Sequence, residues 1–188
     1  MAFLFKIQIQ GISKPPVWRK LLVPEDFTFN SFHKAIQNAF GWYDSHNYEF
    51  SPSGWGSSPS IGSQFEKYFD DGAEKDANMV KLKDIFKKEN QKFMYIYDFG
   101  DEWRHKITLE KIIAEKPEKA LCLDGKGACP PEDCGGVYGY LEFQRIINDS
   151  QDPEHVDMMD WAVLNEGEKW EDRYPFDLEE ANKMVQSV

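Results

Sequence analysis

Residues 1–23, MAFLFKIQIQGISKPPVWRKLLV, contain two strand patterns separated by a turn. In the first pattern every second residue is large and apolar, which is the period of a half-buried strand: Phe3, Phe5, Ile7 and Ile9. Residues 11–16 are rich in glycine and proline, and residues 17–23 then form a second strand pattern that Pro24 ends. This stretch predicts an antiparallel hairpin with one buried face.

Residues 92–109, KFMYIYDFGDEWRHKITL, predict a second hairpin. If Gly100 and Asp101 form a two-residue loop, Asp98 and His105 become diagonal neighbours on one apolar face. A carboxylate beside an imidazole can fix its tautomer in a metal or general-base site, and it can equally be a structural hydrogen bond. A three-residue loop would change the parity of the pairing and separate the two groups.

The same pairing places aromatic and cationic side chains together on the opposite face, namely Tyr95, Tyr97, Arg104 and Lys106. Aromatic rings that alternate with cations can stack on bases and neutralise phosphates. This face is therefore interpreted either as a platform for single-stranded nucleic acid or as a second packed face of the sheet.

Helical periodicity occurs once early in the chain and dominates its end. After Asn30, a candidate N-cap, apolar residues recur at helical spacing up to Gly41, with His33 and Gln37 predicted on the solvent side. Later helices are predicted after residues 135–136, from residues 152–153 and after Asp177. Strands early and helices late predict an α+β fold: an antiparallel sheet of two or more hairpins, packed with one early helix and a C-terminal helical set.

Length and charge predict one soluble domain over residues 1–188. The 188 residues have a net charge of −11, and residues 111–188, with 8 basic and 18 acidic side chains, carry −10 of it. Such a charge opposes direct binding of nucleic acid and favours a protein partner with a basic surface. No apolar run approaches the length of a membrane span, and three cysteines cannot all pair, so a cytoplasmic location without membrane contact is expected.

Two segments differ in composition from the rest of the domain. Residues 51–63 contain eleven Ser, Gly or Pro residues among thirteen, so residues 51–78 are expected to form a flexible loop. Residues 136–188 are expected to be mainly helical and acidic on their outer faces.

A segment rich in ligand-type side chains, residues 122–136, suggests zinc, but its spacing argues against it. The gaps between Cys122, Cys129 and Cys134 are six and four residues, whereas structural zinc sites typically contain close pairs of ligands such as Cys-x2-Cys. The following glycines lack the Lys-Ser/Thr of a phosphate-binding loop. No nucleophile motif of the Gly-x-Ser-x-Gly kind occurs. A tight loop leading into a helix is the preferred interpretation.

Four blocks of sequence resemble the plasmid pRiA ORF-three-like family, small bacterial and archaeal proteins often encoded on plasmids and transposons. The blocks are Pro16-x-Trp18-Arg19, then Phe32-His33-x-x-Ile36-Gln37 with Phe40-Gly41-Trp42 and His46, then Tyr97-Asp98-Phe99-Gly100-Asp101-x-Trp103-x-His105, and last Cys129-Pro130-Pro131-Glu132-Asp133 with Gly135-Gly136 and Gly139-Tyr140. The resemblance covers nearly the whole chain and implies no established activity. Some relatives are called resolvases, but the four arginines of this chain are scattered rather than clustered as strand exchange requires.

The resemblance and the residue analysis converge on one candidate polar site, made of His46, Asp98, Asp101, His105, Glu132 and Asp133. The first hypothesis is a non-enzymatic binding or interaction domain associated with mobile genetic elements, which needs no cofactor and whose acidic helices meet a basic protein. The alternative is a metal-dependent hydrolase in which Asp98, His105, Glu132 and Asp133 hold Mn²⁺ or Zn²⁺ and the ion generates hydroxide.

Overall fold

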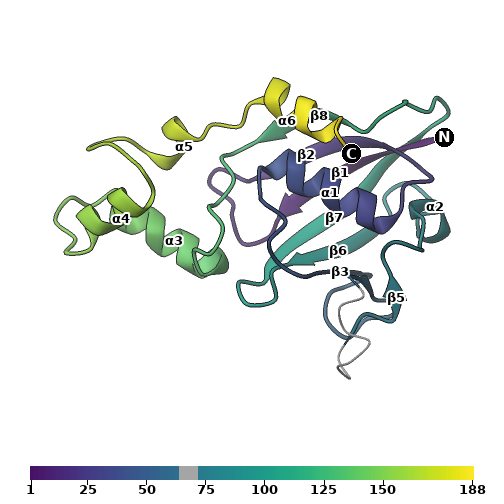
Figure 1. Cartoon of the computed structure of the whole chain (residues 1–188), viewed down its shortest axis with the longest axis horizontal. Coiled ribbons are helices and arrows are strands. Elements are labelled where there is room, and N and C mark those ends of the chain that lie inside the picture. The colour runs from purple at the N-terminus through teal and green to yellow at the C-terminus, as the bar shows by residue number, and fades with distance from the viewer. Residues whose placement is uncertain (64–71) are drawn as a thin grey trace.

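An eight-stranded sheet forms the centre of the computed structural model, which describes residues 1–63 and 72–188 (Figure 1). The strands are β1 (Ala2–Ile9), β2 (Trp18–Pro24), β3 (Tyr48–Ser51), β4 (Ile61–Gly62), β5 (Lys75–Asp76), β6 (Lys92–Tyr97), β7 (Trp103–Ile113) and β8 (Leu121–Lys126). Their order across the sheet is β5-β4-β3-β6-β7-β1-β2-β8, and every neighbouring pair is antiparallel except β4 with β5. The predicted α+β class is therefore confirmed.

The first hairpin forms as predicted and supplies one wall of the core. Strand β1 pairs with β2 from Ala2 opposite Pro24 to Gln8 opposite Trp18. The alternating residues Phe3, Phe5, Ile7 and Ile9 are all buried. They face helix α1 (Phe29–Phe40), which lies across this side of the sheet in Figure 1.

Helix α1 begins two residues earlier than predicted. Its N-cap is Thr28, whose hydroxyl accepts a hydrogen bond from the Ser31 amide, and it ends as predicted at Gly41 in the left-handed region, at φ 86°. Its apolar face packs into the core through rings such as Phe32, whose centroid lies 4.8 Å from that of Phe5. The prediction that His33 and Gln37 face solvent is wrong, because both are buried.

The second hairpin forms, but its pairing differs by one residue from the prediction. Tyr97 pairs with Trp103 and Tyr95 pairs with His105, so the loop contains five residues, 98–102. Both end residues of this loop, Asp98 and Glu102, are left-handed, with φ of 56° and 54°. An odd number of loop residues reverses the parity assumed for a two-residue loop. Tyr95, Tyr97, Trp103, His105 and Ile107 consequently share the buried face.

The segment predicted as a loop over residues 51–78 contains two short strands. Strand β4 pairs with β3, and β5 pairs in parallel with β4, which extends the sheet at this edge. The aromatic ring of Trp55 contacts that of Phe99 in the second hairpin, with centroids 4.7 Å apart. Residues 64–71 of this segment lie outside the described residues.

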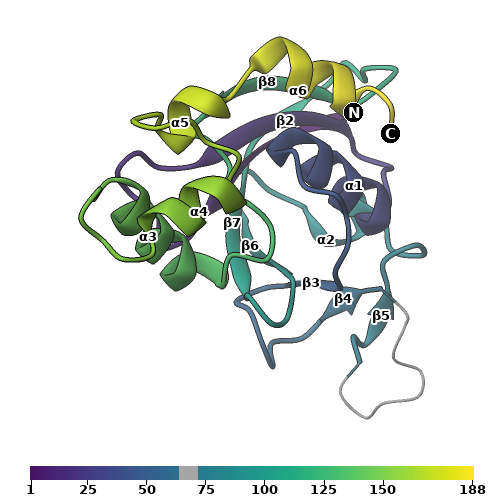
Figure 2. The ribbon, with the colours of Figure 1, turned by 60° about the vertical axis from the view of Figure 1, so that its left-hand side comes forward.

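Most of the remaining helices follow the sheet, as predicted. They are α2 (Leu82–Ile85), α3 (Gly136–Ile147), α4 (His155–Trp161), α5 (Trp170–Arg173) and α6 (Leu178–Val185). Helices α3 and α4 extend away from the sheet, whereas α6 returns to lie beside α1 and β8 (Figure 2). Asp177 caps α6 as predicted, since its side chain accepts from the Glu180 amide. Within the described residues, no helix combines the length and the apolar character needed to cross a membrane.

Candidate functional site

Three of the six predicted site residues converge at the end of the second hairpin. The His46 Nε2 atom lies 3.1 Å from Asp133 Oδ1 and 3.6 Å from Asp98 Oδ2. One ligand-type atom from each residue lies within 4.8 Å of the other two. The three residues come from separate segments: the loop after α1, the turn between β6 and β7, and the loop before α3. The fold, not local sequence, therefore assembles this group.

The hairpin turn fixes the carboxylate of Asp98. Its Oδ1 atom accepts hydrogen bonds from the amides of Gly100 at 2.9 Å and Asp101 at 3.3 Å. The backbone of Asp98 is left-handed, a conformation that aspartate tolerates better than most residues because its side chain can bond to the local backbone. The turn thus uses one oxygen and leaves Oδ2 directed at His46.

A second contact holds the loop of Asp133 against this turn. Asp101 Oδ2 accepts a hydrogen bond of 3.0 Å from the amide of Gly135. At the next residue the backbones approach so closely that a Cβ on Gly136 would lie 2.1 Å from the carbonyl oxygen of Asp101. Glycine is required at this position, and its φ of 67° also favours it. Asp101 therefore positions the site without joining the cluster.

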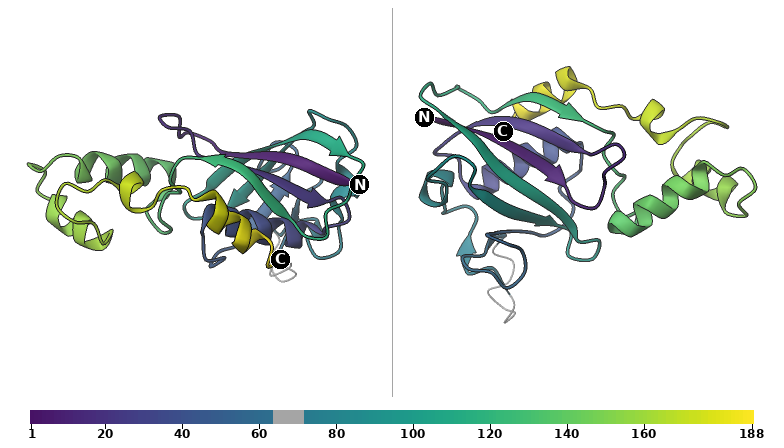
Figure 3. Two further views of the ribbon diagram at one scale, coloured as in Figure 1. Left: turned by 90° about the horizontal axis from the view of Figure 1, so that it is seen from above. Right: turned by 180° about the vertical axis from the view of Figure 1, so that it is seen from behind.

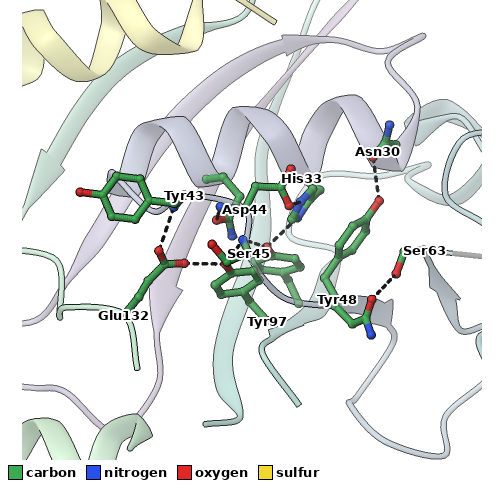
Figure 4. Close-up of polar contacts among 12 residues, drawn as sticks. Asn30, His33, Tyr43, Asp44, Ser45, Tyr48, Ser63, Tyr97 and Glu132 are labelled. Atoms are coloured by element: carbon green, nitrogen blue, oxygen red, sulfur yellow. Dashed lines mark hydrogen bonds and ion pairs between the residues drawn. The ribbon is translucent and has the colours of Figure 1, made fainter. Parts of the chain in front are cut away.

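Glu132 is not a member of the cluster, and its carboxylate bonds to Tyr97 and Tyr43 (Figure 4). Its Oε1 accepts from the Tyr97 hydroxyl at 2.6 Å, and its Oε2 accepts from the Tyr43 amide at 3.1 Å. The Tyr97 oxygen in turn accepts from the Ser45 amide at 2.9 Å. Burial raises the pKa of Tyr97, and Glu132 raises it further, so this hydroxyl remains a donor. These contacts tie the loop of His46 to the loop of Asp133.

The group has the features of an open cation site. His46 Nε2 is buried, yet among the described residues it makes no hydrogen bond of acceptable geometry. The exposed fractions of the side chains are 11% for Asp98, 29% for His46 and 73% for Asp133, so the group opens to solvent on one side. Two carboxylates and one imidazole are ligands that suit Mn²⁺ and Zn²⁺.

Comparison with known proteins supports the family resemblance that the four blocks of sequence indicated. The family model described as plasmid pRiA4b ORF-3-like protein matches residues 1–183. The chain belongs to this family. A crystal structure of a protein of unknown function, MM3350 from Methanosarcina mazei Go1, is similar with a TM-score of 0.77 and 34% identity over 95% of this chain and 96% of that one. The uncharacterized protein y4hQ of Sinorhizobium fredii (strain NBRC 101917 / NGR234) is 35% identical over 151 residues, which are 79% of this chain and 75% of that protein.

The comparisons establish membership of the pRiA4b ORF-3-like family but no activity. The similar proteins just named are described as uncharacterized or of unknown function. The function of this family member therefore has to be argued from the arrangement of its own residues.

One predicted site residue, His105, lies elsewhere, and its pairing with Asp98 is wrong. It is fully buried beneath α1, with its ring 5.2 Å from that of Phe40, and its Nδ1 bonds to the Trp103 carbonyl at 2.9 Å. Burial lowers its pKa to about 3. The shift in pairing places Tyr95 instead of Asp98 beside His105, and burial keeps this core imidazole neutral at pH 7.

The corrected pairing also removes the predicted nucleic-acid platform. Tyr95 and Tyr97 are fully buried on the core face, away from Arg104 and Lys106 on the other face. The cysteines do not form the zinc site that spacing already disfavoured. They are free thiols, and no group of three or more ligand-type side chains in residues 1–63 and 72–188 includes them.

A buried polar network beneath the site was not predicted. The Tyr95 hydroxyl lies 2.8 Å from His33 Nδ1 and accepts from Gln37 Nε2 at 2.9 Å. His33 Nε2 lies 2.6 Å from Asp44 Oδ1, and the Asp44 amide donates to Gln37 Oε1 at 3.1 Å (Figure 4). Desolvation lowers the pKa of His33, although Asp44 opposes this effect. The network anchors the loop that carries His46, and the only signal for it in the sequence was two polar residues at the edge of the apolar helix face.

Proposed function

We propose that the protein binds one divalent cation through His46, Asp98 and Asp133, and that it is a metal-dependent hydrolase. The observation that supports this is the convergence of three ligand atoms within 4.8 Å, on loops that other contacts already fix. Structural zinc sites are usually closed by four protein ligands, whereas catalytic sites keep three and leave a position for water or substrate. Three ligands with a solvent-facing side fit the second class.

The cation would supply two kinds of chemistry to this site. It would lower the pKa of a bound water so that hydroxide is available near neutral pH, and it would polarise an oxygen of the substrate. The protein residues hold the ion: Asp98 is fixed by the hairpin turn, and His46 Nε2 is kept without another hydrogen bond. This ligand set differs in two ways from the one expected from sequence. His46 replaces His105, and Glu132 is left out because its carboxylate already accepts a hydrogen bond from the Tyr97 hydroxyl.

Metal binding can be tested by calorimetric titration of chelator-treated protein with Mn²⁺ and with Zn²⁺. One ion should bind per chain, and Asp133→Asn should weaken binding by at least about tenfold, since even supporting residues of metal sites have effects of that size. Asp133 is exposed, so this change should leave the fold intact. Asp172→Asn alters an equally exposed acid on α5 and is the matched control. Two outcomes would contradict the site: neither ion binds, or Asp133→Asn and His46→Ala both bind the ions as tightly as the wild-type chain does.

Hydrolysis needs a separate assay. Chromogenic carboxyl esters and phosphoesters should be cleaved in the presence of Mn²⁺ or Zn²⁺, and both chelation and Asp133→Asn should abolish cleavage. An ion that binds but supports no cleavage of either class would contradict the hydrolase and leave a metal-dependent binding domain.

A binding or interaction domain is the second candidate function, and the exposed surface of α4 favours it. Val156 and Trp161 on this helix are 67% and 50% exposed, although both are apolar. Acidic residues Asp157 and Asp160 lie between them and are also exposed. A protein partner with a basic, partly apolar surface would match this helix. Association with mobile genetic elements stays a prediction from the family resemblance.

A further inference from the structure

One face of the sheet is covered by α1 and α6, and none of the described helices covers the other face. Figure 3 shows this second face from behind, with the strands in front of α1. We call it the open face. It consists of the alternate strand residues that are only partly buried or exposed, among them Lys6, Trp18, Lys20, Arg104, Lys106 and, on β8, Asp124.

The open face is basic, in a chain whose net charge is −11: Lys6 lies opposite Lys20, and apolar residues lie to either side along these two strands, the pair Leu4 and Leu22 at one end and Trp18 at the other. The Lys6 ammonium lies over the Trp18 ring, 4.6 Å from its centroid. Lys20 pairs with Glu110 at 2.8 Å, and Arg104 pairs with Glu102. Strand β8 adds Asp124, opposite Lys20, and Lys126, opposite Trp18. Outside the two pairs, these residues therefore include three cations, Lys6, Lys106 and Lys126, against one acid, and the face remains basic.

The complementary surface lies on the part of the chain that extends away from the sheet. Helix α4 buries one side, chiefly Met159, against α3. Its other side, which we call the arm face, is exposed and alternates apolar with acidic side chains: Val156, Asp157, Asp160 and Trp161, with Glu154 and Val163 at its ends. Residues at these positions fall on one side of a helix because of its 3.6-residue period. An apolar and acidic helix face of this kind is unusual for a surface that contacts only water.

We propose that the arm face of one copy of the chain packs on the open face of a second copy. The charges are opposite, and each surface has a tryptophan, Trp161 at the end of α4 and Trp18 at the start of β2. Burial of such rings contributes much of the free energy of an interface, and opposite charges select the partner. The arm does not reach its own open face, since α3 and α4 extend past the end of the sheet (Figure 3).

In a reciprocal dimer, the open face and the arm face of both copies are covered. Each copy would then give its arm face and receive the arm of the other, which closes as a two-fold dimer. The alternative occupant of a basic face is single-stranded nucleic acid, but the charge of −11 repels a polyanion before it can reach the face. The observations therefore favour an acidic segment of protein, and the chain carries one.

Sedimentation equilibrium of the full chain, at low and high micromolar concentration, tests the proposal. We expect a reversible dimer at about 0.1 M NaCl and a shift toward monomer at about 1 M, where surface charges are screened. Lys6→Glu with Lys106→Glu should raise the dissociation constant by at least about tenfold, as should Asp157→Lys with Asp160→Lys. Lys34→Glu changes an exposed lysine of α1, on the covered side of the sheet, and should leave the dimer unchanged.

Mixing the two charge-reversed variants gives the decisive result. Each should be monomeric alone with an unchanged circular dichroism spectrum, and together they should form a mixed dimer. Three results would overturn the proposal: a monomeric wild-type chain at all concentrations, a dimer that neither double variant weakens, or no association in the mixture. Retention of a single-stranded oligonucleotide by a monomeric chain, lost in Lys6→Glu with Lys106→Glu, would assign the open face to nucleic acid instead.

Discussion

Acid should destabilise this protein through one buried imidazole, His105. In the folded protein its pKa is lowered from 6.5 to about 3 by burial, whereas in the unfolded chain it returns to its ordinary value. Between these two pKa values the unfolded chain binds one more proton than the folded one, so the free energy of unfolding falls as the pH decreases. At pH 7 and above the unfolded chain gains almost no proton, and the effect vanishes. The two pKa values give a loss of about 2–3 kcal/mol from pH 6 to pH 4.

The variant His105→Asn isolates this contribution from that of the carboxylates. Its side-chain amide can replace Nδ1 as the donor to the Trp103 carbonyl but cannot take up a proton in this pH range. Urea unfolding at several pH values should show that the difference in stability between wild type and variant shrinks by about 2–3 kcal/mol from pH 6 to pH 4. A difference that stays constant with pH would refute the argument, because it would mean that His105 can be protonated in the folded state.

Three further predictions concern stability, measured by urea unfolding. The last of them also concerns Mn²⁺ binding, measured by calorimetric titration. Arg19→Met should cost about 3 kcal/mol or more, because its buried guanidinium donates to four backbone carbonyls, whereas Arg173→Met on the surface should cost little. Tyr95→Phe should lower the free energy of unfolding by about 1–3 kcal/mol, because it removes the hydroxyl that is hydrogen-bonded to the buried side chains of His33 and Gln37. Gly136→Ala should be destabilising and should also weaken Mn²⁺ binding, whereas Gly167→Ala, also left-handed but with open space around it, should affect only stability.

The spacing of apolar residues predicted the strands and helices, because the residues that an element buries recur with a fixed period within its own sequence. The alternation of Phe3, Phe5, Ile7 and Ile9 required no knowledge of the partner strand, and the cap at Asp177 required only its own helix. The start of α1 was displaced by two residues, since Thr28 and Asn30 are both good N-caps and tertiary contacts decide between them. Local chemistry thus sufficed for the elements but not for their exact ends.

The sequence named six candidate residues, of which only His46, Asp98 and Asp133 converge in the structure. For His105, the length of one hairpin loop explains the difference. A change of one residue in pairing exchanges the two faces of β6 relative to β7, so Tyr95 and Tyr97 lie beside His105 in the core, whereas Asp98 does not. The loop has five residues because Asp98 Oδ1 can accept the amides of Gly100 and Asp101, which stabilises a wider turn than glycine and aspartate alone suggest. His46 could be named only from the resemblance, since nothing in its immediate sequence links it to residues 98 and 133.

Two of the proposed cation ligands, Asp98 and Asp133, are among the six left-handed non-glycine residues of the described chain. Asp98 and Asp133 are both left-handed, at φ of 56° and 58°, and Gly136 next to them permits a contact that no other residue would allow. Such conformations cost about 1–3 kcal/mol each and persist where surrounding contacts over-determine them. Here the contacts are the Asp98 turn and the Asp101 bond to Gly135, and both aim a carboxylate at His46 instead of stabilising the core. Asn90 and Val163 have the same backbone conformation without such contacts, so the argument for a ligand rests on the two carboxylates that converge on His46 and not on the left-handed backbone alone.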